Sequence, residues 1–288
     1  MTSKDRLAPE DRQPAPRPQS LLLTFLGMHV LDRKVAISSG SVIEVLGAAG
    51  VSEDATRASL SRMARRGLLT RSRHGRKVYF GLTGRSTAVL RDGHDRIWSA
   101  GAVNRDWDGT WTLIGFSLPE DWRRRRHDLR SRLVWAGFGP LQNGLWIAPG
   151  RVAVPPLISG LDLDEHVNVM HAQAADPTDA GRLLHQAFDT AEIASRYRAF
   201  LAGWDKPGPA PDVPDDFTRQ LLLHHDWLQL VRSDPRLPAD HLPGDWPAIR
   251  AEQVFHALSH EWDAAALRHA KAGLDTVPAA PPGVGGSS

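Results

Sequence analysis

Residues 52–82 restrict the fold more than any other part of this 288-residue chain. Ser52 is a typical helix N-cap, and acidic Glu53 and Asp54 follow it in the first turn, where the helix dipole favours negative charge. At about 100° per residue, one side of a helix running to Gly67 carries Thr56, Leu60, Met63 and Ala64. The opposite side carries Arg57, Ser61, Arg62 and Arg65. This pattern predicts a helix that packs by its apolar side and leaves its arginines in solvent.

Two short strands, Leu68–Arg73 and Arg76–Leu82, are predicted directly after this helix. His74-Gly75 between them is a two-residue loop, and glycine tolerates the positive φ that such a turn requires. Pairing of residue 73 with residue 76 places Leu69 opposite Phe80 and Arg71 opposite Val78. The base of the hairpin is then apolar, and the basic residues at its tip are Arg73, His74, Arg76 and Lys77.

Further helices are predicted on both sides of this helix and hairpin. Leu21–Leu31 is an apolar first helix, and Ser41-Val-Ile-Glu44 is a capping-box pattern for a second helix that Gly50 ends. Thr83 begins a fourth helix that runs to about Trp98. This order of elements is the layout of a winged helix-turn-helix, in which a recognition helix enters the major groove of DNA.

The winged helix-turn-helix interpretation assigns DNA contacts to named side chains. Residues near the start of the recognition helix reach base edges, and the wing meets phosphates beside the groove. We expect base contacts from Arg57, Ser61 and Arg62. We expect phosphate contacts from Arg65, Arg71, Arg73, Arg76 and Lys77, with His74 beside them at the tip of the wing.

The distribution of charge agrees with this interpretation. The first 100 residues contain 17 basic and 9 acidic residues, a net of +8, whereas the remainder contains 18 and 24, a net of −6. A charge run alone is usually a solvated face. Here the charge, the cap positions and the turn residues all point to the same DNA-binding module.

Composition excludes several classes of protein. The chain has no cysteine, which excludes disulfide frameworks, zinc fingers and thiol chemistry. Its longest apolar stretch, around Leu21–Met28, is far too short to span a bilayer, and residues 1–20 are polar and proline-rich. We therefore expect a soluble, cytoplasmic protein.

Breaks rich in proline or glycine divide the chain into modules. A disordered arm is expected at 1–19 and a disordered tail at 274–288, because neither holds enough apolar residues to offset the entropy of ordering. Between them we expect a winged helix-turn-helix domain at 20–99, a ferredoxin-like domain at 105–175 and a helical domain at 178–273. The expected class is α+β.

The middle segment combines strands with one crossover helix, which is typical of a ferredoxin-like sandwich. Its expected strands are Trp111–Leu118, Gly144–Ala148 and His166–His171. Its helix is expected at Glu120–Ala136, opened by a capping box at Ser117–Glu120. The helices expected in the last third are Asp179–Leu201, Phe217–Ser233 and Trp246–Ala272.

Two histidine clusters lie on predicted helices, His256 with His260 and His224-His225-Asp226. Neither helix carries the HExxH pattern of zinc proteases. The chain also lacks a GxSxG nucleophile elbow, a GxxxxGK[ST] phosphate loop and a GxGxxG turn after a strand. We therefore expect no metal, no cofactor and no catalytic residue.

These segments together resemble the PaaX family, repressors of phenylacetate-catabolism operons that are distant relatives of GntR-type regulators. The resemblance covers about residues 20–272. The matching segments, in order, are Leu21-Leu-Leu-Thr-Phe-Leu-Gly27, Gly50-Val-Ser-Glu-Asp-Ala-Thr-Arg57, Leu60-Ser-Arg-Met-Ala-Arg-Arg-Gly67, Trp107-Asp-Gly-Thr-Trp111, Gly137-Phe-Gly-Pro-Leu-Gln-Asn-Gly-Leu-Trp-Ile-Ala-Pro149, Asp234-Pro-Arg-Leu-Pro238 and Leu242-Pro-Gly-Asp-Trp246.

The resemblance implies a homodimer that binds a palindromic operator of double-stranded DNA and is released by an aryl-CoA thioester, phenylacetyl-CoA in the best-known members. For the anionic end of such a ligand the candidates are Arg123, Arg126 and Arg130. For its aryl group the candidates are Trp111, Trp146 and Trp227.

The middle domain is also similar to the small ferredoxin-like nucleases of CRISPR spacer acquisition, which carry a catalytic aspartate at the end of the first strand. Here that end reads Phe116-Ser117-Leu118-Pro119-Glu120, without an aspartate. Nuclease activity is therefore not expected.

Two other functions compete with the repressor hypothesis. One is an enzyme acting on CoA thioesters or nucleic acid through the arginine-rich helix and the His224-His225-Asp226 cluster. The other is a structural DNA protein without sequence preference, which would show a steep salt dependence and bind operator and random duplex equally.

Overall fold

The computed structural model describes residues 17–98, 101–206, 213–232 and 234–279. The chain divides into two compact units, one made of 1–91, 213–222 and 265–288 and the other of 92–212 and 223–264. Each unit combines helices with an antiparallel sheet, which confirms the α+β class. Residues 1–16 and 280–288, most of the expected arm and tail, lie outside the described residues, and the three-domain division stays a prediction.

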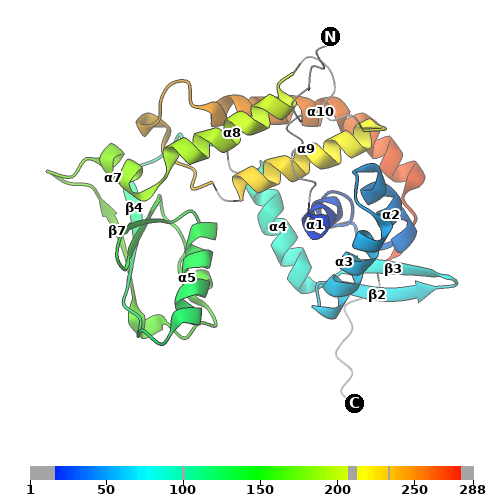
Figure 1. The fold of residues 1–288 in the computed structure, drawn as a ribbon, viewed down its shortest axis with the longest axis horizontal. Helices are drawn as coiled ribbons and strands as arrows, with labels where there is room; N and C mark the ends of the chain where they lie inside the picture. The colour runs from blue at the N-terminus through cyan, green and yellow to red at the C-terminus, as the bar shows by residue number, and fades with distance from the viewer. Residues whose placement is uncertain (1–16, 99–100, 207–212, 233, 280–288) are drawn as a thin grey trace, which may run out of the picture. The chain divides into compact units, whose positions relative to one another are not determined.

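The first unit joins a set of helices to a four-stranded sheet with the strand order β2-β3-β1-β8. Figure 1 shows its β2–β3 hairpin projecting beyond the neighbouring helices. Its elements are α1 (Pro18–His29), β1 (Val35–Ser38), α2 (Ser39–Ala48), α3 (Glu53–Arg65), β2 (Leu69–His74), β3 (Lys77–Leu82), the start of α4 (Gly84–Trp98), the start of α9 (Asp216–Val231), the end of α10 (Pro247–Gly273) and β8 (Thr276–Pro278).

One apolar core joins these elements although they come from distant parts of the sequence. It contains α1 and α2 through residues such as Phe25 and Leu46, and α3 through Leu60 and Met63. The ends of the long helices enter the same core through Leu221 of α9 and, on α10, Ala266 and Ala270. Burial of each large apolar side chain stabilises the fold by about 1.5–3 kcal/mol. The first unit therefore depends on residues more than 180 positions beyond its hairpin.

Two predicted helix starts in this unit are wrong. The helix α1 begins at Pro18, inside the expected arm, because proline is well suited to the first turn of a helix. The helix α2 begins at Ser39 rather than at the Ser41 capping box, and the Ser38 hydroxyl accepts a hydrogen bond from the Ser41 backbone N–H at 3.1 Å. The cap is displaced because the strand β1 ends at Ser38 and leads directly into the helix.

The tail expected to be disordered contains a strand. β8 pairs with β1, with Ala36 opposite Val277 and Ile37 opposite Thr276. Backbone hydrogen bonds extend this pairing on both sides, from Ser38 N–H to the Asp275 carbonyl (2.9 Å) and from Ala279 N–H to the Lys34 carbonyl (2.8 Å). The backbone edge of β1 supplies the hydrogen-bond partners of β8, and the composition of the tail alone does not reveal these partners.

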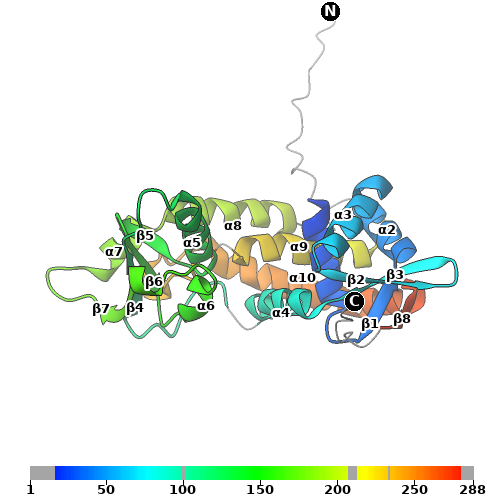
Figure 2. The ribbon, with the colours of Figure 1, turned by 90° about the horizontal axis from the view of Figure 1, so that it is seen from below.

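The second unit contains a sheet with the order β5-β6-β4-β7, and α5 lies against one of its faces (Figures 1 and 2). Leu129 and Leu133 of α5 pack there with Ile114 and Trp146. The elements up to the last strand are β4 (Thr110–Phe116), α5 (Arg123–Trp135), β5 (Gly139–Gln142), β6 (Leu145–Pro149), α6 (Pro155–Ile158), a 3-10 turn (Asp164–His166) and β7 (Val167–Gln173). They are followed by α7 (Ala180–Ala187), α8 (Thr190–Trp204), most of α9, a second 3-10 turn (Ala239–His241) and most of α10.

Two predictions for this unit are wrong, and one strand is missing from the predicted set. The helix α5 begins at Arg123 without a side-chain cap, so the Ser117–Glu120 capping box is wrong. The strand β5 was not expected. The predicted helix Asp179–Leu201 is two helices, because Asp189 interrupts it and caps α8 by accepting a hydrogen bond from the Glu192 N–H at 2.9 Å.

A buried histidine lies in the core of the first unit. The His29 ring stacks on Phe217 with 4.9 Å between centroids, and neither ring nitrogen has a hydrogen-bond partner among the described residues. Burial, with a smaller contribution from Arg33 and then His269, lowers the pKa of His29 from 6.5 to about 4. His29 is therefore neutral in the folded protein at pH 7 and must be protonated against its surroundings in acid.

Replacing His29 by leucine should reduce the acid sensitivity of folding. Because the folded-state pKa lies below the unfolded value, the stability linked to His29 is fully present above pH 6.5 and is lost as the pH falls toward 4. Between about pH 7.5 and pH 5 the loss amounts to about 2 kcal/mol in the wild type. Urea unfolding of both proteins at the two pH values measures it.

The matched control is His127→Gln, at an exposed position on α5. It should leave the difference in unfolding free energy between the two pH values as it is in the wild type. An unchanged difference in His29→Leu would show that His29 does not carry this sensitivity.

Candidate nucleic-acid interface

The helix α3 separates a buried side from a basic side. Ser52 caps it, its hydroxyl accepting a hydrogen bond from the Ala55 N–H at 3.3 Å, as predicted from the sequence. Its buried residues are Thr56, Ser59, Leu60 and Met63, which pack toward α1 and α2. Its predicted DNA-contacting residues are all exposed: Arg57, Ser61, Arg62 and Arg65.

Local partners hold some of these arginines without burying them. The guanidinium of Arg57 donates to Glu53 Oε1 (Nε to Oε1 2.7 Å), one turn earlier on α3. Arg62 donates to the Ser59 hydroxyl at 3.0 Å. Within the described part of the chain, Arg65 has no hydrogen bond or ion pair. Exposed ion pairs contribute at most about 1 kcal/mol, so these side chains are available to another partner.

The hairpin forms, but with a register that differs from the predicted one. His74 pairs with Lys77 and Leu69 with Leu82, so the two-residue loop is Gly75-Arg76 rather than His74-Gly75. Gly75 takes a φ of +60° at the first loop position, which the primed hairpin turns require. Each side chain stays on its predicted face of the hairpin. The reason is that the cross-strand partner of each residue changes by two positions, which is one full repeat of the strand alternation.

The basic residues of the hairpin lie on both of its faces. Arg71 and Arg73 alternate with Ser72 and His74 along β2, and Lys77 pairs with His74. One face therefore carries Arg71 and Arg73, and the other carries His74 and Lys77. All five predicted basic residues of the wing are exposed: Arg71, Arg73, His74, Arg76 and Lys77.

Lys77 is the residue of this set that has a long-range acidic partner. Its ammonium lies 2.7 Å from Asp275 Oδ2, and the Tyr79 hydroxyl donates to the same carboxylate at 3.1 Å. The hydrogen bond and charge of Asp275 raise the pKa of Lys77, and chiefly the hydrogen bond from Lys77 lowers the pKa of Asp275. Sequence reasoning missed Asp275, and its signal was weak, since only the β-branched pair Thr276-Val277 indicates a strand beside it.

The three tryptophans proposed for an aryl group are not brought together. Trp111 and Trp146 lie on opposite faces of one sheet, because Trp146 pairs with Ile114, three residues from Trp111 on β4. Trp227 lies on α9, where it stacks on Phe255 at 4.8 Å and contacts the ring of Tyr197. All three are buried, so each is part of a separate packed region.

The three arginines proposed for an anionic ligand differ in whether they already have partners within the protein. Arg126 donates to the carbonyls of Leu118 (2.9 Å) and Pro119 (3.0 Å) and so supports the loop before α5. Arg123 and Arg130 are exposed. Four consecutive arginines begin α5 without an acid in its first turn, an arrangement that the helix dipole disfavours and that attracts anions.

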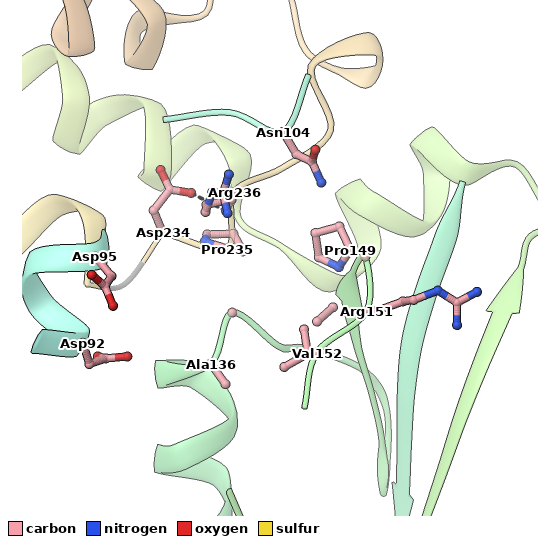
Figure 3. Close-up of a pocket in the computed structure, with 13 residues that line it drawn as sticks. Asp92, Asp95, Asn104, Ala136, Pro149, Arg151, Val152, Asp234, Pro235 and Arg236 are labelled. Atoms are coloured by element: carbon pink, nitrogen blue, oxygen red, sulfur yellow. Dashed lines mark hydrogen bonds between the residues drawn. The ribbon is translucent and has the colours of Figure 1, made fainter. Parts of the chain in front are cut away.

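A cleft of about 500 Å³ lies elsewhere in the second unit (Figure 3). Asp92 and Asp95 of α4 form one wall, and the loop carrying Asp234 and Arg236 forms another. Asp234 is buried and accepts hydrogen bonds from the Tyr197 hydroxyl and the Arg236 N–H, and burial raises its pKa. None of the six proposed ligand residues lines this cleft.

The His224-His225-Asp226 cluster is built into helix packing, whereas His256 and His260 are exposed. The His224 ring shares a 2.9 Å hydrogen bond with the Ser259 hydroxyl, and Asp226 accepts one from the Trp204 indole N–H at 3.0 Å. Burial lowers the pKa of His225 to about 4 and raises that of Asp226 to about 6. Among the described residues no group of three or more His, Asp or Glu side chains is placed to hold a metal ion, and no helix there is long and apolar enough to cross a membrane.

The chain is similar to known proteins along most of its length. Residues 17–86 match a family model described as PaaX-like protein, residues 104–184 match the PaaX protein central Cas2-like domain, and residues 188–272 match the PaaX-like protein C-terminal domain. Over 248 residues the chain is 27% identical to the transcriptional repressor PaaX of Escherichia coli (strain K12), covering 82% of this chain and 77% of that protein.

A solved structure supports the fold. The uncharacterized protein Rv0674 from Mycobacterium tuberculosis matches with a TM-score of 0.59 and 23% identity, over 90% of this chain and 99% of that one. The family resemblance found in the sequence is thus confirmed by three domain matches in the same order and by a curated relative. This chain belongs to the PaaX family of transcriptional repressors.

Proposed function

We propose that this chain is a ligand-responsive transcriptional repressor that binds operator DNA through a winged helix-turn-helix made of α2, α3 and the β2–β3 hairpin. The observation that carries the proposal is the two-sidedness of α3, which buries Leu60 and Met63 and exposes its arginines beside a basic hairpin. The E. coli relative is a transcriptional repressor, which supports the same role. We therefore propose a regulator and not an enzyme.

Base contacts come from the exposed side of α3, which lies in the major groove. The guanidinium of Arg57 or Arg62 matches the paired acceptors O6 and N7 of guanine, and the Ser61 hydroxyl reaches a neighbouring base edge. Arg65 and the wing residues Arg71, Arg73 and Arg76 bind phosphates and set the position of α3. Lys77 and His74 lie on the opposite face of the wing from Arg71 and Arg73.

A palindromic operator calls for a two-fold dimer, and the edge strand β7 is the surface that we propose for it. Strand β7 is at the end of its ferredoxin-like sheet and contains no charged residue. Val169 (43% exposed) and Met170 (50% exposed) are adjacent and so lie on opposite faces of this strand. Edge strands that stay single usually carry lysine, proline or a bulge. Antiparallel pairing of two β7 strands about Met170 would cover both apolar side chains.

The effector that we propose is an aryl-CoA thioester, with its phosphates at Arg123 and Arg130. For the effector to release DNA, it must bind the DNA-incompetent form of the dimer more tightly than the competent form. A coupling free energy of about 1–3 kcal/mol changes operator affinity by about 5- to 150-fold.

Substituting Arg62 by alanine should relax sequence specificity, because a base contact is lost. We expect a cost of about 1–3 kcal/mol on the operator and little on a random duplex. Arg76→Ala should weaken both duplexes equally and reduce the slope of log Kd against log salt by about 0.9. Fluorescence anisotropy with the DNA upstream of the protein's own operon measures both. Arg198→Ala, on an exposed part of α8, is the control, and equal losses on both duplexes for Arg62→Ala would contradict its base-reading role.

Placing a charge in the middle of β7 should prevent dimerisation. Met170→Lys would bring two ammonium groups together at the two-fold axis, so the dimer should dissociate and affinity for a palindromic operator should fall more than affinity for a half-site. Sedimentation velocity gives the mass. Val134→Lys is the matched control, since Val134 is 49% exposed but lies on α5. If the protein with Met170→Lys is still a dimer, the interface lies elsewhere.

An effector of the proposed class should stabilise the folded protein. At a concentration 100 times its Kd, a ligand adds about 2.7 kcal/mol to the free energy of unfolding. A thermal-shift series with acyl-CoA thioesters, CoA and free aromatic acids tests this. The double variant Arg123→Ala/Arg130→Ala should lose most of the shift, and Arg198→Ala should keep it. Absence of a shift with every thioester would contradict the ligand class, and a full shift in the double variant would contradict the assigned arginines.

A further inference from the structure

Residues 275–279 form part of the sheet that carries the wing, although they follow the wing by almost 200 positions. This segment lies beyond the residues that the three family models match, the last of which ends at 272. The Asp275 N–H donates to the Ser41 hydroxyl at 2.9 Å, and the Asp275 carbonyl accepts from Ser38 N–H at 2.9 Å. The backbone of Asp275 is therefore fixed against the start of α2 and the end of β1.

This fixed backbone holds a carboxylate next to the wing. Asp275 Oδ2 lies 2.7 Å from the Lys77 ammonium, and the Tyr79 hydroxyl donates to both carboxylate oxygens, at 3.1 and 3.3 Å. Lys77 and Tyr79 alternate with Val78 along β3 and so lie on the same face of the hairpin. The side chain of Asp275 is 34% exposed and that of Lys77 is 66% exposed, so solvent and ions reach the pair.

We propose that Asp275 lowers the sequence-independent affinity of the DNA interface, because it holds the Lys77 ammonium and withholds this charge from the phosphates of DNA. The inference rests on the proposed function and assigns to the C-terminal segment a direct part in it. Phosphate contacts carry no sequence information. Withholding one of them weakens binding to every duplex, so base contacts from α3 supply a larger share of the affinity.

The strength of the contact suits this role. An exposed ion pair is weak, so its loss changes affinity by about 2- to 5-fold and not by orders of magnitude. Arg76, at the tip of the wing, has no hydrogen bond or ion pair among the described residues. It serves as the comparison for Lys77, because no acidic partner withholds its charge from DNA.

The test measures binding of a fluorescent duplex of mixed sequence over a range of salt concentrations. Asp275→Asn should tighten binding by about 2- to 5-fold and steepen the slope of log Kd against log salt by about 0.9, the value for one added phosphate contact. Asparagine keeps an oxygen for the Tyr79 hydroxyl, and the backbone contacts of residue 275 are unaffected. The control for general repulsion is Asp54→Asn, which removes an exposed carboxylate in the first turn of α3.

Lys77→Ala shows whether Asp275 acts through the lysine. When Lys77 is already alanine, Asp275→Asn should increase DNA affinity no more than Asp54→Asn does. With Asp275 present, Lys77→Ala should weaken binding less than Arg76→Ala does, a comparison that needs no change at residue 275. No gain from Asp275→Asn, an equal gain with and without Lys77, or equal losses from Lys77→Ala and Arg76→Ala would each overturn the inference. A wild-type protein that binds no duplex would overturn the proposed function as well, and that measurement comes first.

Discussion

The burial of Leu60 and Met63 determines which side of α3 meets solvent, and the proposed DNA contacts depend on it. Rotation of the helix would expose these two side chains at a cost of about 1.5–3 kcal/mol each, so the arginines on the opposite side stay in solvent. The contacts of Arg57 with Glu53 and of Arg62 with Ser59 lie within α3 and do not fix its rotation. The core that receives Leu60 and Met63 draws on α1 and α2 and on the last turns of α10. The same packing thus decides the position of the basic surface and ties it to the end of the chain.

Short-range signals in the sequence predicted this surface well. These signals are the hydroxyl cap at Ser52, the glycines at both ends of a helical pattern and the glycine in a two-residue loop. Each acts on residues only a few positions away, so α3 and the hairpin could be predicted without tertiary information. The one-residue displacement of the hairpin loop arose because Gly75 suits either loop position, and strand pairing decided between them. The exposure of the predicted DNA-binding residues follows from the same local periodicity.

Several of the predictions that failed depend on partners far away in the sequence. Val35–Ser38 and Thr276–Pro278 are too short to be recognised alone, and each becomes a strand only because it pairs with another segment. The contact between Lys77 and Asp275 was hidden for the same reason. The ligand residues were grouped by residue type alone, and the strand alternation of β4 and β6 places Trp111 and Trp146 on opposite sides of a sheet.

The pairing of β8 with β1 also bears on how the chain acquires its structure during synthesis. The helices and hairpin of the proposed DNA-binding module are made first, but their sheet is incomplete until residue 278 has left the ribosome. At about 5–20 residues per second, the nearly 200 residues after the hairpin take about 10–40 seconds to translate. During that interval the edge of β1 that pairs with β8 has no partner, and the nascent protein acquires its complete β2-β3-β1-β8 sheet only after these residues have been made.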